Sequence, residues 1–407
     1  MAENAGESSL ARQLTSLVSL KVPSSFGVFP TFSKKPTDLE VSLIDIDTST
    51  RTPAEPFIIR NEEQLREYIE TRHEHQMRII SICSQNSMKP LLITQSAMQT
   101  LLDRYDIGVE FQDLIHSFGR KPQISDAGHG RMTIHRRRNG AYDIQYLLPY
   151  VESYGIDGST KYTDRWVGVF NRFSPERAGQ NLWIILHPKQ NSEAQQRIES
   201  AAEQALDFCN YPSLLHLVIL SSYMGNWRFC IQNLGEEVER MTDRVMVSNF
   251  TDETSHYQAL DWLPKLSGLR EKLLPLKPRL EVVHQVLARL REIDPIVNAQ
   301  ANHLNLGREQ TDDLLEFYLQ RVEGHLQSVE ALEYRLQGTL NLLEVAVDLG
   351  NRNSTGQIDK RMLQLASHSA DDSAAVRVIT FLTMLYLPPS FVSVRVMHSS
   401  LSQLTLE

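Results

Sequence analysis

Hydrophobic and polar positions alternate over short stretches in the first half of the chain, which is the pattern of strands in a sheet. The alternation predicts strands over residues 41–47, 77–83, 166–173 and 181–187. The last of these has five apolar residues in succession, 182–186, as in a strand buried on both faces. Two further strands, 132–138 and 141–147, flank Asn139-Gly140, a dipeptide that favours a two-residue hairpin turn with positive φ angles.

Helical spacing in the same half predicts short helices over residues 61–69, 95–105 and 109–118. Short helices that lie between strands can cover the faces of one sheet. We therefore predict an α/β/α sandwich-like domain over residues 37–190, preceded by an irregular N-terminus over residues 1–36.

From residue 191 onward the pattern is that of helices, so the fold class predicted for the whole chain is α+β. Residues 192–209 and 214–239 have the spacing and end signals of two helices. Pro264, Pro275 and Pro278 predict short or broken helices between residues 252 and 277. Together these helices are expected to form a stalk or bundle over residues 191–372.

One long helix is predicted after residue 309, because apolar residues recur there every three or four positions. The members of this seam are Leu315, Leu319, Val322, Leu326, Val329, Leu332, Leu336, Leu340, Leu343 and Val347. Two interpretations fit the seam. It packs within an intramolecular bundle, or it belongs to a stalk of antiparallel helices and is shared partly between subunits. Gly350 and Gly356 interrupt the periodicity and predict a break in the helix.

Residues 378–394 carry no charge. Seventeen helical residues rise roughly 25 Å, against a hydrocarbon core of about 30 Å. We therefore predict one marginal C-terminal transmembrane helix over residues 373–394, followed by a tail over 395–407. The alternative is a buried helix that ends at Pro388 and docks onto a soluble bundle.

The motifs in this stretch resemble a known family. Leu382-Thr383, Leu387-Pro388 and Ser390-Phe391-Val392, preceded by Arg377-Val378-Ile379-Thr380, are similar to the start of the first transmembrane helix of CorA-like divalent-cation transporters, with the fungal CorA-like branch as the best match. The resemblance implies a homo-oligomer of five copies around a pore, with magnesium as the transported or regulatory ion. The family's Gly-Met-Asn motif and second span are absent, and Arg395-Val396-Met397 stands in their place, so we expect a C-terminally truncated member.

The resemblance also implies which residues line the pore. The candidates are Ser373, Thr380, Thr383, Leu387 and Ser390. Because a pore mouth must replace the water around an ion with oxygen ligands, a ring of Arg395 side chains would repel divalent cations. We expect the chain not to conduct ions alone. The alternative function is that of a soluble helical scaffold or interaction protein with a docked C-terminal helix.

Net charge and cysteine content indicate which partners and which cellular compartment the protein has. A net charge of −9 argues against nonspecific nucleic-acid binding. Cys83, Cys209 and Cys230 are odd in number and far apart, which favours reduced buried thiols. The first ten residues lack a secretory signal. We expect a membrane protein with most of the chain in the cytosol, or, on the alternative interpretation, a soluble cytoplasmic protein.

Three clusters of polar residues invite a chemical role. The acidic residues between Glu309 and Leu349 have the oxygen ligands that magnesium prefers, although the solvated face of a long helix has the same composition. Arg136-Arg137-Arg138, with Arg120, Lys121 and Arg131, could bind phosphate or anionic lipid, or could protect the edge of a sheet. His73 and His75 lack further ligands nearby. No catalytic or cofactor-binding motif is present in the sequence, so we expect a protein that is not an enzyme.

Overall fold

The computed structural model describes residues 31–46, 54–70, 77–86, 88–120, 122–156, 159–174, 181–203, 212–248, 253–297 and 305–404. The chain divides into two compact units. The first comprises the chain up to Thr242 together with Leu266–Gln337, and the second comprises Asp243–Lys265 together with the chain from Gly338.

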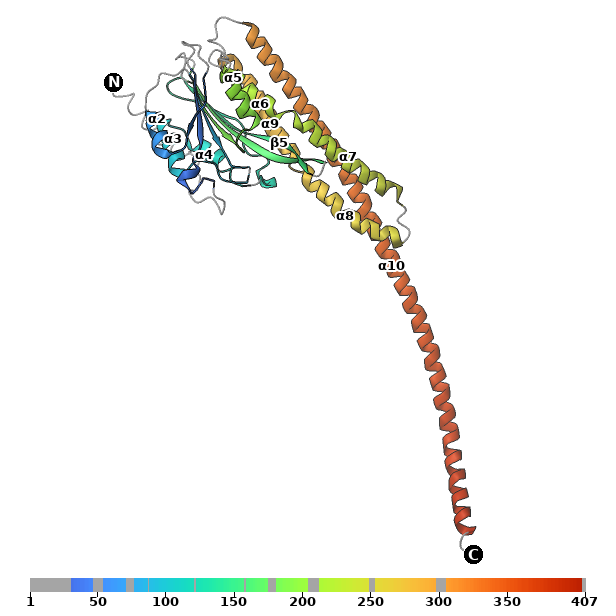
Figure 1. The fold of residues 1–407 in the computed structure, drawn as a ribbon. Coiled ribbons are helices and arrows are strands. Elements are labelled where there is room, and N and C mark those ends of the chain that lie inside the picture. The colour runs from blue at the N-terminus through green and yellow to red at the C-terminus, as the bar shows by residue number, and fades with distance from the viewer. Residues whose placement is uncertain are drawn as a thin grey trace, which may run out of the picture. The chain divides into compact units, whose positions relative to one another are not determined.

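A seven-stranded sheet organises the first unit (Figure 1). Its strands are β1 (Val41–Ile46), β2 (Phe57–Ile59), β3 (Met77–Cys83), β4 (Thr133–Arg136), β5 (Tyr142–Ile156), β6 (Ser159–Phe173) and β7 (Asn181–His187). They lie in the order β2-β1-β3-β7-β6-β5-β4, and only β3 and β7 pair in parallel. Every residue of β7 is buried, which confirms the prediction of a strand covered on both faces.

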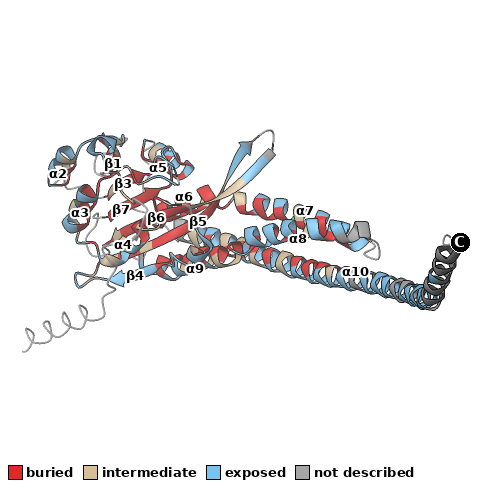
Figure 2. Cartoon of the chain, turned by 90° about the horizontal axis from the view of Figure 1, so that it is seen from below, coloured by how far each residue is buried: buried red, intermediate tan, exposed pale blue. Residues whose placement is uncertain are grey.

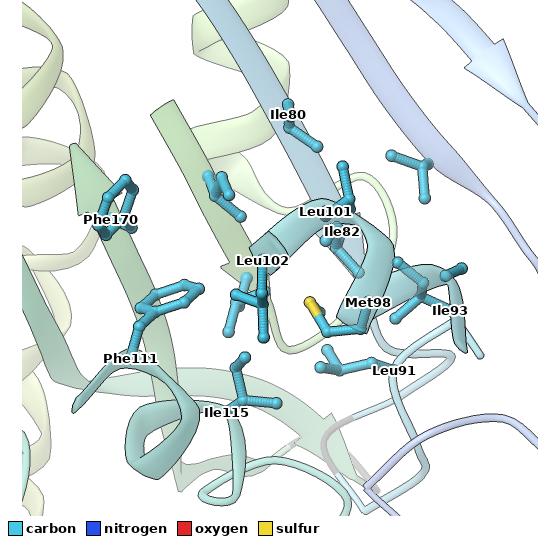
Figure 3. Close-up of a cluster of buried hydrophobic side chains, with 14 of the residues drawn as sticks. Ile80, Ile82, Leu91, Ile93, Met98, Leu101, Leu102, Phe111, Ile115 and Phe170 are labelled. Carbon is cyan, nitrogen blue, oxygen red and sulfur yellow. The ribbon is translucent and has the colours of Figure 1, made fainter. Parts of the chain in front are cut away.

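Helices cover both faces of this sheet (Figure 1). On the first face lie α2 (Glu62–Glu70), α3 (Gln95–Arg104) and α4 (Val109–Ile115). Leu101 and Met98 of α3 and Phe111 of α4 pack there against Ile80 and Phe170 of the strands in one buried cluster (Figure 3). The second face carries α5 (Glu193–Glu203), α6 (Pro212–Tyr223) and α9 (Leu276–Val297).

Alternation along the strands explains the two layers. In β7, Ile184 belongs to the first cluster, while Trp183 turns the other way and its ring lies 4.5 Å from that of His216 on α6. Along β5, Leu147 likewise belongs to the first cluster, while Tyr146 points to the second face, where its ring packs near that of His216. The predicted α/β/α arrangement and the α+β class are therefore confirmed.

The β4–β5 hairpin forms where the sequence predicts it, but its turn is of another type. Only Gly140 has a positive φ, of 80°, and the backbone nitrogen of Arg137 donates to the oxygen of Ala141 at 2.7 Å. A two-residue type I′ turn needs positive φ at both central residues. The turn therefore spans four residues, Arg137 to Gly140, and places the three consecutive arginines at its start.

The remaining helices are α7 (Asn226–Val247), α8 (Glu253–Leu273) and α10 (Asn305–Leu404), with short 3-10 turns at Pro36–Asp38 and Ile124–Asp126. The single helix predicted over 214–239 is divided between α6 and α7, near Gly225. The predicted break at Pro264 is wrong, since α8 continues through it. Pro264 lies on the exposed side of α8, where water can bond to the carbonyl that the proline leaves without a donor.

The backbone of α10 also continues through Gly350, Gly356, Pro388 and Pro389, so the predicted break there is wrong. Most of the side chains described beyond Gly350 are exposed (Figure 2). No helix in the described part of the chain combines the length and the apolar content that crossing a membrane requires. The transmembrane helix predicted over residues 373–394 includes side chains, those of residues 385–394, that lie outside the described part of the chain, so it stays a prediction.

Candidate functional site

The helices α9 and α10 pair side by side in the first unit, within the region predicted to form a stalk or bundle, and we call this pair the stalk. Three contacts between them fix their direction, because the residue number rises along α10 as it falls along α9. These contacts are Arg291 Nε to Asp312 Oδ1 at 2.7 Å, His284 Nε2 to Glu323 Oε1 at 3.2 Å and Lys277 Nζ to Glu330 Oε1 at 2.8 Å. The two helices are therefore antiparallel.

The seam of α10 is buried. Leu315, Val322, Val329, Leu336 and Leu343 are each at most 2% exposed, as their spacing predicts. From α9, Leu280, Val283 and Leu287 are buried as well. Each such side chain stabilises the fold by roughly 1.5–3 kcal/mol relative to exposure in water. The stalk is thus held mainly by apolar packing.

Four acidic residues of the seam helix pair with basic side chains of α9. Asp312 and Glu316 both contact Arg291, while Glu323 and Glu330 contact His284 and Lys277. In the described residues no group of three or more His, Cys, Asp or Glu side chains is arranged to hold a metal ion. This pairing cannot be read from residues 309–349 alone, because the basic partners belong to a separate helix.

Two titratable groups are partly or fully enclosed in the stalk. Burial, together with the charges of Arg321 and Arg228, lowers the pKa of His325 to about 4, so this imidazole is neutral at pH 7. Burial raises the pKa of Glu333, and the nearby Glu330 adds to the shift. Both shifts disfavour the charged form of a group inside the helix packing.

The pore-lining candidates all lie on the backbone of α10. Their spacing by sevens, threes and fours places them along one side of the helix. Ser373, Thr380 and Thr383 are exposed. The Thr380 hydroxyl donates to the oxygen of Val376 at 2.7 Å, and that of Thr383 donates to the oxygen of Ile379 at 2.9 Å. The side chains of Leu387 and Ser390 lie outside the described residues, and the pore-lining role of all five stays a prediction.

A second apolar face lies on α10 beyond Gly356, where the apolar periodicity of the sequence resumes. Ile358, Met362 and Leu365, spaced by four and three, are 58%, 64% and 68% exposed. Val376 and Ile379 continue the same side of the helix and are 61% and 60% exposed. We call these five residues the α10 apolar face. The spacing predicts a buried seam, whereas the residues that the structure describes leave this face uncovered.

The other sequence predictions have mixed outcomes. Cys83 and Cys230 are free and buried, as expected for core thiols, and burial raises the pKa of each to about 12. Cys209, His73 and His75 lie outside the described residues. Arg136, Arg137 and Arg138 lie together at the end of β4 and the turn that follows it.

Comparison with known proteins gives the family. Residues 29–246 match the family model of the CorA-like transporters. No curated protein matches the sequence. Among solved structures, the chain is similar to that of the full-length CmaX protein, with 12% identity, a TM-score of 0.43 and coverage of 87% of this chain and 84% of that one.

It is also similar to the ZntB cytoplasmic domain from Vibrio parahaemolyticus RIMD 2210633, with 10% identity, a TM-score of 0.33 and coverage of 78% and 99%. The assignment rests on the sequence match, which contains all seven strands and the helices from α2 to α6. Since the matched residues make up more than half of the 407, this chain belongs to the family of CorA-like transporters.

Proposed function

We propose that this chain is one subunit of a homo-oligomeric assembly that transports divalent metal cations, with magnesium as the transported or regulatory ion. The observation that carries the proposal is the family match over residues 29–246. In this role the sheet unit and the stalk helices lie in the cytosol, and the protein is not an enzyme.

The α10 apolar face supports assembly from identical copies. Burying an exposed apolar side chain of this size contributes about 1.5–3 kcal/mol, and Ile358, Met362 and Leu365 lie one above another along the helix. Pairing of such faces between copies is the usual way in which long helices associate. Five copies is the number that the resemblance to the family implies.

We further propose that the chain does not conduct cations by itself. Arg395-Val396-Met397 stands where the resemblance leads one to expect Gly-Met-Asn, and the described Arg395 is exposed. A ring of guanidinium groups at a pore mouth opposes the entry of divalent cations. The chain would then act together with CorA-like proteins that carry the Gly-Met-Asn motif.

The test is magnesium uptake in cells that lack their own CorA-like transporters. The chain alone is expected to restore no magnesium uptake. Co-expression with a CorA-like protein that carries the Gly-Met-Asn motif is expected to change the magnesium uptake rate measured for that protein alone. Uptake by the chain alone that Ser390→Leu abolishes would contradict the nonconducting role. An unchanged rate on co-expression would contradict a role in transport.

A further inference from the structure

A cleft of about 720 Å³ opens beside the β4–β5 hairpin in the first unit. Its walls are the α3–α4 connection at Asp106 and Gly108, Glu110 of α4, and the hairpin from Thr133 to Asp143. Phe170 of β6 lies at its base. The volume is within the usual range for sites that hold small ligands. The three consecutive arginines of the hairpin all line it.

The middle arginine is fixed in place by carboxylates. Arg137 Nε donates to Asp143 Oδ2 at 2.7 Å, and its Nη1 donates to Asp106 Oδ2 at 2.8 Å. Arg172 of β6 holds the same carboxylate of Asp143 through Nε at 2.6 Å and Nη2 at 2.9 Å. These bonds use the carboxylate of the hairpin, Asp143, and that of the α3–α4 connection, Asp106, so both walls are braced and their negative charge is already neutralised.

The outer two arginines are not neutralised. Arg136 and Arg138 are exposed and form no ion pair among the described residues. The guanidinium of Arg136 lies 5.8 Å from the centre of the Tyr142 ring, which holds it along the strand. The remaining carboxylate, that of Glu110, turns back over Gly108 at the start of its own helix. With Arg172, which bonds to Asp143 but does not line the cleft, four arginines meet three carboxylates, so one positive charge is in excess, and Arg136 and Arg138 are the two arginines without a carboxylate partner among the described residues.

We propose that this cleft binds a phosphate-bearing anion between Arg136 and Arg138. Guanidinium groups recognise phosphate oxygens through paired, charge-assisted hydrogen bonds. Thr133, Gln145 and Asn139 add neutral polar groups around the same space. Charges that only protect the edge strand β4 from pairing would need neither a cleft nor a carboxylate-braced wall behind them. The phosphate belongs either to a soluble molecule or to a lipid headgroup.

The experiment measures binding by the full-length chain to two probes. Sodium tripolyphosphate, followed by calorimetry, represents a soluble ligand, and phosphatidylcholine vesicles that contain a phosphatidylinositol bisphosphate represent a headgroup. The double variant Arg136→Gln/Arg138→Gln is expected to weaken binding at least about tenfold. The matched control is Arg228→Gln/Arg240→Gln, which removes two exposed arginines from α7 and should bind as the unaltered chain does.

The outcomes separate the possible ligands. Binding of tripolyphosphate alone identifies a soluble ligand, and binding of the vesicles alone identifies a headgroup. Partial retention in Arg136→Lys/Arg138→Lys supports recognition through positive charge and excludes a folding defect. Failure of both probes to bind, or equal weakening in the hairpin variant and the α7 control, would overturn the proposal.

Discussion

Two buried histidines make the stability of the sheet unit sensitive to acid. His187 lies 2.9 Å from the Ser192 hydroxyl, and His216 lies 2.9 Å from that of Tyr146. Burial lowers the pKa of each imidazole from 6.5 to about 3. Between these pH values the unfolded chain binds protons that the folded chain does not. The stabilisation is thus complete above pH 6.5 and is lost as the pH falls toward 3.

We predict that the free energy of unfolding is smaller at pH 5 than at pH 7. Since pH 5 lies about 1.5 units below the unfolded pKa, each of these histidines costs about 2 kcal/mol there. Urea titrations at the two pH values measure the difference. His216→Gln should show a smaller loss, because one histidine no longer titrates. Equal free energies of unfolding at both pH values would show that the pKa values of these imidazoles are the same in the folded and unfolded states.

A buried arginine of α9 forms an ion pair with the sheet. Arg279 has a side chain that is only 2% exposed, and its Nη1 lies 2.6 Å from Asp164 Oδ2 on β6. The guanidinium also lies 5.8 Å from the centre of the Trp166 ring. Removing one partner leaves a buried charge without compensation.

Asp164→Asn is therefore predicted to destabilise the protein by about 3 kcal/mol. Asp261→Asn serves as the control, since it breaks an exposed pair with Lys265 of the same helix and should cost less than about 1 kcal/mol. Denaturant unfolding of both variants gives the comparison. Similar small losses in the two variants would indicate that the Arg279 pair does not fasten α9 to the sheet.

At the scale of elements, the seam of α10 is the feature on which the stalk depends. Leu336 is 1% exposed, whereas the next residue, Gln337, is exposed. Leu336→Asp removes apolar packing and places a carboxylate in the seam, so we predict a loss of about 3–5 kcal/mol. Gln337→Asp introduces the same charge on the outer face and should change stability little. Thermal unfolding that is the same for both variants would argue against the seam.

Sequence patterns predicted those elements that local periodicity alone determines. The ranges expected for β3 and β7 are the ranges found, because both strands are strongly apolar and bounded by polar residues. β2 was missed because its three residues are too few to show a pattern. The continuity of α8 through Pro264 could not be predicted, since it depends on which side of the helix faces water.

The same division applies to the candidate site. The buried seam of α10 follows from spacing, so it was predictable. The basic side chains that pair with Asp312, Glu316, Glu323 and Glu330 lie on α9, so their role follows only from the pairing of the two helices. The exposure of Ile358, Met362 and Leu365 likewise depends on what packs nearby, which periodicity does not report.

At the scale of the whole molecule, two features meet in one chain. A sheet domain covered by helices on both faces carries the match to the CorA-like transporters. The long helix α10 carries an apolar face that the described residues of this chain leave exposed. The assembly of identical chains proposed above gives this apolar face a partner, because the face becomes a contact between copies.

The mass of the full-length chain in solution, measured by light scattering over a range of concentrations, tests this account most directly. The unaltered chain is predicted to have the mass of a homo-oligomer, with five copies expected. Ile358→Gln/Met362→Gln/Leu365→Gln should shift it toward a single copy, whereas the control Asn351→Gln/Ser367→Gln, which alters polar positions on the same helix, should keep the oligomer. A single-copy mass for the unaltered chain at every concentration, in buffer and in detergent alike, would contradict the account.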